Sequence, residues 1–140
     1  MGMLGLYQLV YFAQHRNSEA KHVLSQSCNT QRYFPFAAAG INVTAFTLRM
    51  LEQRRLDPLL YEVLAKLMLP GRVSSCPSQD ALALAGLSFF NDFYCQQYVE
   101  FSRYWHDSLP EDSMAFPAIF GIVKQRSQRR HPRLAEEYWG

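Results

Sequence analysis

The residues that could carry chemistry are few and lie far apart in the chain. The candidate metal ligands and nucleophiles are His15, His22, His106, His131, Cys28, Cys76 and Cys95. They form no CxxC pair or HExxH stretch, and no phosphate-binding loop, dinucleotide fingerprint or nucleophile elbow occurs. His15 and His22 would share a helical side with Glu19 only if Asn17-Ser18 did not break their helix. The sequence therefore predicts no metal, no cofactor, and free thiols in a reducing compartment.

Cys95 and the His106-Asp107 pair form the one combination that would suit a thiol hydrolase. Such a nucleophile needs a paired base and an activating field, whereas the sequence around Cys95 favours packing inside a long helix. Asn42 and Thr44 also stand among apolar residues. Thr44 can bond to a carbonyl one turn earlier, and Asn42 must face solvent or bridge to a neighbouring element. We expect structural roles for these side chains and assign no catalytic centre.

Charge and composition narrow the class of protein further. The chain has 140 residues, a formal net charge of +2, and 49% hydrophobic and 14% aromatic residues. These values predict one globular domain with a ring-rich core and no general attraction for nucleic acid. Cations gather at 124–133, where no acid occurs. This stretch could touch phosphates or an acidic membrane, but it lacks interleaved aromatics, so we assign 127–140 as a basic tail that extends into solvent.

The chain opens with the apolar stretch MGMLGLYQLVYF. It has no basic residue before Arg16 and is interrupted by Gln8, so it fits neither a signal peptide nor a membrane span of roughly 20 apolar residues. We predict no transmembrane segment. Instead, the spacing predicts a helix from Met3 to His15 that is buried on most sides. Its expected buried face carries Met3, Leu6, Leu9 and Val10.

Helical spacing continues along almost the whole chain, and no alternating strand pattern appears. Pro35 fits the first turn of a helix in which Gly40 predicts the close approach of a neighbour, and Asp57-Pro58 starts the next helix. A long helix from Asp80 to Trp105 carries two apolar stripes, which predicts partners on both sides. Ser113 is the expected cap of a last helix, whose spacing is lost after Lys124. The prediction is an all-α single irregular domain of about six helices around a long central helix.

Four stretches together resemble a known family: GMLGLYQLVYF, YFPFAAAGINVTAFTLRML, FFNDFYCQQYVEFSRYW and MAFPAIFGIVKQR. Their order and separation resemble the ELMO domain over residues 1–126, and most of all its small ELMO-domain-containing members of the third, divergent paralogue group. The patterns are G-x-L-G-L-x-x-L-x-Y-F and Y/F-P-F-A-x-x-x-I-N-[VIL]-T. The residues that match them are Gly2, Leu4, Gly5, Leu6, Leu9, Tyr11, Phe12, Pro35, Phe36, Ile41, Asn42 and Thr44.

The resemblance implies a cytoplasmic GTPase-activating protein for small GTPases of the Arf and Arf-like group, associated with the cytoskeleton or membranes. Such a protein usually inserts an arginine against the charge that develops on the transferred phosphoryl. In the family, the candidate arginine belongs to an Asp-[Leu/Phe]-Arg segment just before the G-x-L-G-L run. This chain has no counterpart of that arginine, so the resemblance implies an N-terminally truncated form.

A non-catalytic role is the alternative. The chain would then bind a GTPase or a cytoskeletal partner as an interaction module without accelerating hydrolysis. In both cases we expect the Ile41-Asn42-Thr44 segment to be scaffold and part of the surface that faces the GTPase.

Overall fold

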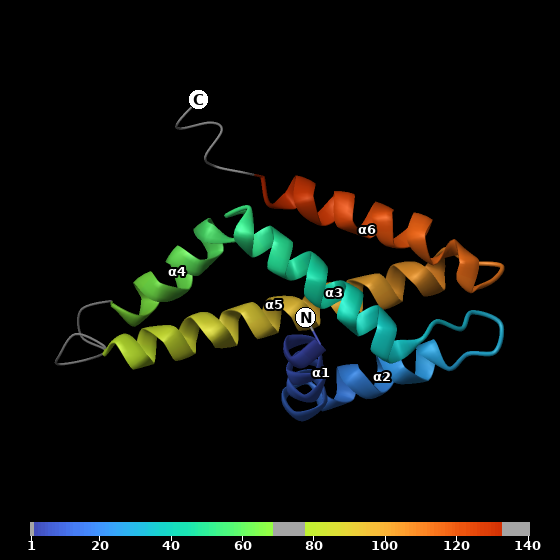
Figure 1. Cartoon of the computed structure of the whole chain (residues 1–140), viewed down its shortest axis with the longest axis horizontal. Coiled ribbons are helices and arrows are strands. Elements are labelled where there is room, and N and C mark those ends of the chain that lie inside the picture. The colour runs from blue at the N-terminus through green and yellow to red at the C-terminus, as the bar shows by residue number, and fades with distance from the viewer. Residues whose placement is uncertain (1, 69–77, 133–140) are drawn as a thin grey trace.

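The computed structural model describes residues 2–68 and 78–132, and within these ranges it contains helices and no strand. Figure 1 shows the long α5 crossing the molecule, with other helices on both sides of it. The predicted all-α fold is confirmed, while Cys76, one of the candidate nucleophiles, lies outside the described residues. The helices are α1 (Gly2–His15), α2 (Asn17–Ser27), α3 (Phe36–Glu52), α4 (Asp57–Leu67), α5 (Gln79–Asp107) and α6 (Phe116–Arg130), with a 3₁₀ turn, η1 (Ser113–Ala115), before α6.

The central helix α5 packs against α1, α2, α3, α4 and α6. It begins after Ser78, whose hydroxyl accepts a hydrogen bond from the Ala81 amide at 3.2 Å, as an N-cap does. One of its two predicted stripes is fully buried, and on the other Phe93 is buried while Phe89 is half-buried. Partners on both sides are therefore confirmed. The buried members of the first stripe are Phe90, Tyr94, Phe101 and Trp105.

An aromatic cluster around Phe101 joins α5 to α6 and to the segment before α3. The centre of the Phe101 ring lies 5.2, 5.3 and 5.6 Å from the ring centres of Phe34, Phe116 and Phe120. All three pairs are edge-on, an arrangement that aromatic pairs prefer. The indole of Trp105 donates to the Arg32 carbonyl at 2.8 Å. These contacts hold the chain on α5 just before α3 begins, and so set where α3 starts.

The ends of several helices differ from the sequence-based expectation. The break between α1 and α2 lies at Arg16, which leaves the helical region (φ −128°, ψ 50°), so α2 already begins at Asn17. Before α6, the side chain that caps is Asp112 and not Ser113: its carboxylate accepts from the Met114 amide at 2.9 Å. The expected Ser113 cap is wrong because the 3₁₀ turn starts one residue earlier than the spacing indicated.

The last helix also runs further than expected, to Arg130, and so enters the range that we assigned as tail. Tertiary contacts explain this extension. Ser127 is buried, with its hydroxyl 3.7 Å from the Met50 sulfur, and Arg55 donates to the carbonyls of Gln128 and His131 at 3.2 Å each. A cation that satisfies the last carbonyls stabilises a helix end. None of the helices within 2–68 and 78–132 is both long and apolar enough to span a membrane.

Candidate protein-interaction surface

Two glycines set the crossing of α1 and α3. A Cβ on Gly5 would lie 3.2 Å from Cγ1 of Ile41, and a Cβ on Gly40 would lie 2.6 Å from Cδ2 of Leu9. A side chain at either position would crowd these contacts, so the two glycines favour the close approach of the helices. The Thr44 hydroxyl donates to the Gly40 carbonyl at 3.1 Å, as the sequence predicted. The close approach at Gly40 is confirmed, and it brings the two motifs, far apart in sequence, into contact.

Polar contacts tie the other side of α1 to α5. The buried Gln8 side chain donates to the Asn91 amide oxygen at 3.3 Å, and the Tyr11 hydroxyl donates to the Asp92 carboxylate at 2.9 Å. Burial, and then the bond to Asp92, raise the pKa of Tyr11 to about 12. One weak signal of this site is present in the sequence: Gln8 lies one turn before Phe12, on the side that is buried. From the sequence alone, Gln8 is only a break in an apolar run.

The outward face of α1 is apolar. Met3 is 82% exposed, Leu6 58%, Tyr7 49% and Val10 45%, and at 100° per residue they form one stripe. This stripe lies opposite Gly5, Gln8 and Phe12, the buried residues of α1. The expectation that Met3, Leu6 and Val10 form the buried face is therefore wrong, and of that set only Leu9 is partly buried. Helical spacing alone fits the exposed and the buried side of α1 equally well. Gly5 and Gln8 are not typical core residues, so the sequence does not indicate that their side is the one that packs.

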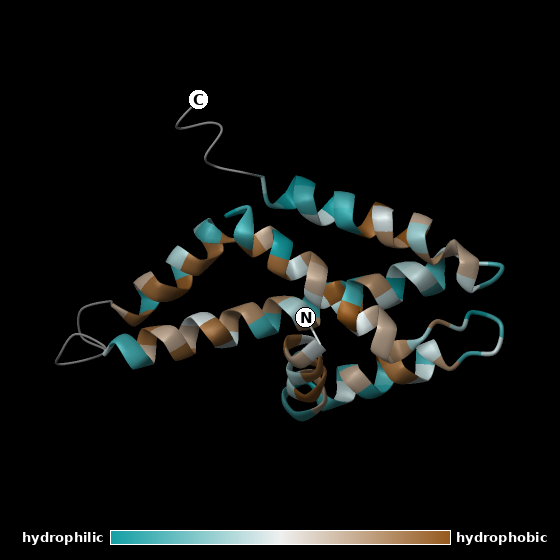
Figure 2. Ribbon diagram, viewed as in Figure 1, coloured by the Kyte–Doolittle hydropathy of each residue, from teal (hydrophilic) through white to brown (hydrophobic). Residues whose placement is uncertain are grey.

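The stripe borders the exposed part of α3. Ile41 lies against Gly5 and is 42% exposed, and the next residue, Asn42, is exposed and donates to the Ala38 carbonyl at 2.9 Å. Asn42 thus faces solvent, one of the two options that the sequence left open. Figure 2 shows the apolar colouring of α1 beside α3. We call the set Met3, Leu6, Tyr7, Val10 and Ile41 the α1 apolar surface.

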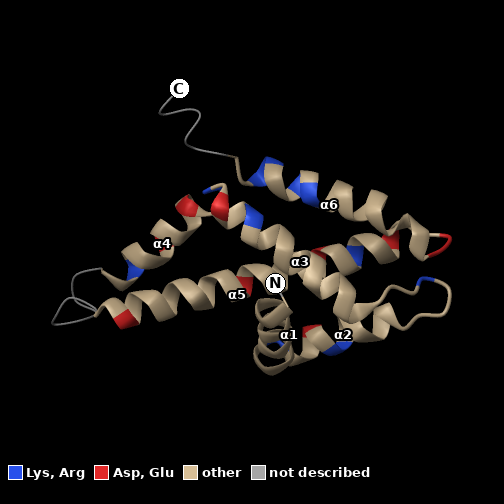
Figure 3. Ribbon diagram, viewed as in Figure 1, with Lys and Arg blue, Asp and Glu red and all other residues tan. Residues whose placement is uncertain are grey.

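A groove of about 380 Å³ lies between α3 and α6, beginning at Asn42. Arg49 and Lys124 supply its charge, and no carboxylate from residues 2–68 or 78–132 lines it. Figure 3 shows the blue of Lys and Arg on both helices, and no red on α6. We call this the α3–α6 groove; its lining residues are Asn42, Ala45, Phe46, Arg49, Phe120, Gly121, Lys124, Gln125 and Gln128.

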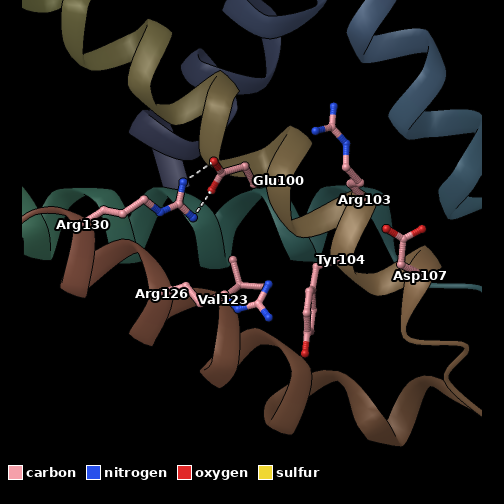
Figure 4. Close-up of a pocket in the computed structure, with 7 residues that line it drawn as sticks. All are labelled: Glu100, Arg103, Tyr104, Asp107, Val123, Arg126 and Arg130. Carbon is pink, nitrogen blue, oxygen red and sulfur yellow. Dashed lines mark hydrogen bonds and ion pairs between the residues drawn. The ribbon is translucent and has the colours of Figure 1, made fainter.

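A smaller pocket of about 180 Å³ lies between α5 and α6, and both arginines and carboxylates line it (Figure 4). Arg130 donates to both carboxylate oxygens of Glu100, at 2.7 and 3.0 Å. The guanidinium of Arg126 lies 4.6 Å from the centre of the Tyr104 ring. Because these cations already have partners, the pocket mainly fastens α6 to α5.

The side chains that could have formed an enzyme site lie apart. Burial, and then the nearby Asp92, raise the pKa of the Cys95 thiol to about 12. The neutral thiol packs in the core, as the sequence around it favours. His106 lies instead beside Arg32, 3.0 Å from its guanidinium. No group of three or more histidine, cysteine or acidic side chains within the described ranges is arranged to hold a metal ion.

Known proteins resemble this chain over most of its length. A profile of the ELMO/CED-12 family matches residues 1–120. The chain belongs to the ELMO/CED-12 family. Similar proteins include ELMO domain-containing protein 2 of Homo sapiens, 32% identical over 116 residues that make up 83% of this chain and 34% of that protein. Others are ELMO domain-containing protein B of Dictyostelium discoideum (26% over 119 residues; 85% and 34%) and ELMO domain-containing protein 1 of Bos taurus (26% over 154 residues; 96% and 42%).

The ELMO/CED-12 match confirms the resemblance drawn from the motifs. The chain spans about a third of the length of the first relatives it matches, and no solved structure matches it. In this ELMO/CED-12 chain the motif residues divide by burial. Gly5, Phe12 and Thr44 are buried; Leu4, Leu9, Tyr11, Pro35 and Phe36 are half-buried; Gly2, Leu6, Ile41 and Asn42 are exposed. The first two groups build the junction of α1, α3 and α5, and the exposed group is open to a partner.

Proposed function

We propose that this chain regulates small GTPases of the Arf and Arf-like group by binding them through the α1 apolar surface. The observation that carries the proposal is the exposed stripe at Met3, Leu6, Tyr7 and Val10, on the helix that begins with the family's glycine motif. Membership in the ELMO/CED-12 family supports it. Regulation of this group places the protein in the cytoplasm, at the membranes or cytoskeleton where such GTPases act.

An exposed helical stripe of this kind suits a protein partner. Side chains at i, i+3, i+4 and i+7 that face solvent leave apolar area uncovered, and such patches mark interaction sites. Leu6 and Ile41 flank Gly5, so the surface spans two helices that are rigidly packed. Small GTPases reorder their switch loops with the bound nucleotide. A fixed apolar surface can therefore distinguish the GTP-bound form by the shape that these loops take.

The position of α1 relates this surface to catalysis. In the family that the sequence resembles, the candidate arginine lies just before the G-x-L-G-L run, which here starts at Gly2, the first residue of α1. A GTPase held on Met3 and Leu6 would have that end of α1 close to its switch loops. The stripe itself is uncharged and can bind without supplying a catalytic group, which supports a second function: a module that binds the GTPase without accelerating hydrolysis.

Binding can be tested with two double variants that match in exposure. The test variant, Met3→Asp/Leu6→Asp, places charge on residues that are 82% and 58% exposed. The control variant, Met114→Asp/Leu109→Asp, places charge on residues that are 83% and 60% exposed, one in η1 and one before it. The full chain is titrated with Arf-like GTPases carrying a non-hydrolysable GTP analogue or GDP. We expect the first variant to weaken binding to the GTP form about 10-fold or more, since charge in a desolvated apolar contact costs over ~1.4 kcal/mol. The second should bind like the unmodified chain.

Failure of the unmodified chain to distinguish GTP from GDP forms would contradict the proposal, as would equal loss in both variants. Single-turnover hydrolysis with and without the chain then separates the two functions. Acceleration of about 10³-fold or more, the usual effect of an inserted arginine, identifies an activator. Binding without acceleration identifies an interaction module.

A further inference from the structure

The α3–α6 groove holds positive charge that no ion pair within residues 2–68 and 78–132 neutralises. Arg49 on α3 and Lys124 on α6 line it, and among the described residues neither is within ion-pair distance of a carboxylate. By contrast, Arg54 and Arg130 pair with Asp57 and Glu100. The Nζ of Lys124 lies 5.0 Å from the centre of the Phe120 ring. The groove therefore favours an anionic group.

Its other polar residues are side-chain amides. Asn42, Gln125 and Gln128 each carry one acceptor oxygen and two N–H donors. Asn42 uses one donor on the Ala38 carbonyl, and within the described part of the chain no donor bonds to its oxygen. A peptide backbone offers donors and acceptors alternately, whereas a phosphate offers acceptors only. Amides on both walls consequently match an extended polypeptide better than a lone phosphate.

The floor of the groove is aromatic and has room. The rings of Phe46 and Phe120 meet edge-on, with 6.2 Å between their centres. Gly121 also lines the groove, and a Cβ built on it would meet nothing within 4 Å. The volume of about 380 Å³ lies within the range of ligand sites, so a large apolar side chain can lie on this floor beside a carboxylate held by the cations.

The groove is continuous with the surface already described. Ile41 belongs to the α1 apolar surface and Asn42 to the groove, and they are consecutive residues of one rigid helix. We propose that the α3–α6 groove binds an acidic segment of the same small GTPase, with its carboxylates on Arg49 and Lys124 and its backbone on the amides. This assignment rests on the proposed function and adds to it a second, charged contact.

Three variants of the full chain test the assignment, each titrated with Arf-like GTPase carrying a non-hydrolysable GTP analogue. Arg49→Glu/Lys124→Glu reverses the groove's charge, and Gly121→Leu fills its open space. Lys21→Glu/Lys66→Glu is the control, because it changes the net charge equally at exposed positions away from the groove. Thermal unfolding of each variant checks the fold.

We expect both groove variants to weaken binding about 10-fold or more and the control to stay within about twofold. When the salt concentration rises from ~50 to ~300 mM, the affinity of the unmodified chain should fall, and the affinity of the charge-reversed variant should fall less. If both groove variants bind normally while Met3→Asp/Leu6→Asp does not, the assignment is overturned and the proposed function stands. The assignment is also overturned if vesicles with anionic lipid bind through Arg49 and Lys124 while GTPase binding is insensitive to them. Absence of GTPase binding by the unmodified chain would overturn both.

Discussion

Along α3, the buried face and the groove face differ in how closely other groups approach. On the buried face, Gly40 leaves no space for a Cβ, and the hydroxyls of Thr44 and Thr47 donate to backbone carbonyls one turn earlier. On the groove face, the side chains of Asn42 and Arg49 border about 380 Å³ of open space. One face therefore has its hydroxyls bonded and its volume filled, whereas the other borders open space and carries Arg49, which has no ion pair among the described residues.

This difference separates residues that hold the fold from residues that are free to bind. Close packing makes any change of volume costly, so the buried face tolerates little variation. Charges and amides at an open groove contribute little to folding, since solvent screens them. Stability and GTPase binding should consequently respond to different substitutions of the same helix.

The largest expected contrast is between two consecutive residues, Met50 on the buried face and Arg49 on the groove face. Met50 is fully buried, so Met50→Ala should lower the free energy of unfolding by about 2–5 kcal/mol through the cavity it leaves. Arg49→Ala should change it by less than about 0.5 kcal/mol. Urea unfolding followed by circular dichroism measures both values. Equal losses would show that Arg49 is a structural residue, and the division of α3 would fail.

Substitutions of two glycines should change the free energy of unfolding in opposite directions. Gly40→Leu forces atoms into the contact with Leu9 and Tyr98 and should lower the free energy of unfolding by about 1–3 kcal/mol. Gly121→Leu enters open space and replaces a poor helix former, so it should raise that free energy by up to about 0.8 kcal/mol. Thermal unfolding of the two variants side by side is the measurement. Destabilisation by Gly121→Leu would mean that the groove closes in solution.

The smallest contrast concerns hydrogen bonds. Thr44→Val removes a buried hydroxyl that donates to Gly40, which should cost about 1 kcal/mol. The exposed amide of Asn42 bonds to Ala38 in the same way along the helix, but Asn42→Ala should change the free energy of unfolding by less than about 0.5 kcal/mol, because water replaces the bond. Hydrogen exchange of the α3 amides measures the effect of both variants. If Asn42→Ala lost more protection than Thr44→Val, the assignment of the two faces would be reversed.

Much of the fold followed from local spacing. The long helix with two stripes, the restart at Asp57-Pro58 and the back-bond of Thr44 are all present, because capping, proline geometry and the helical repeat act within a few residues. The outward face of α1 was assigned incorrectly. Met3, Leu6 and Val10 satisfy the helical repeat as well as a core face does, and the sequence did not show that Gln8 has a buried partner in Asn91.

The sequence by itself determined the helices, their approximate ends and the family, since these depend on neighbouring residues and on motifs read in order. Only the tertiary structure decided which apolar stripe of α1 is exposed, that α6 continues to Arg130, and that Arg49 and Lys124 share one groove. These features depend on residues many positions apart that meet when helices pack. Burial and pairing are properties of such contacts, so hydrophobic spacing along one helix indicates a face but not the partner that covers it.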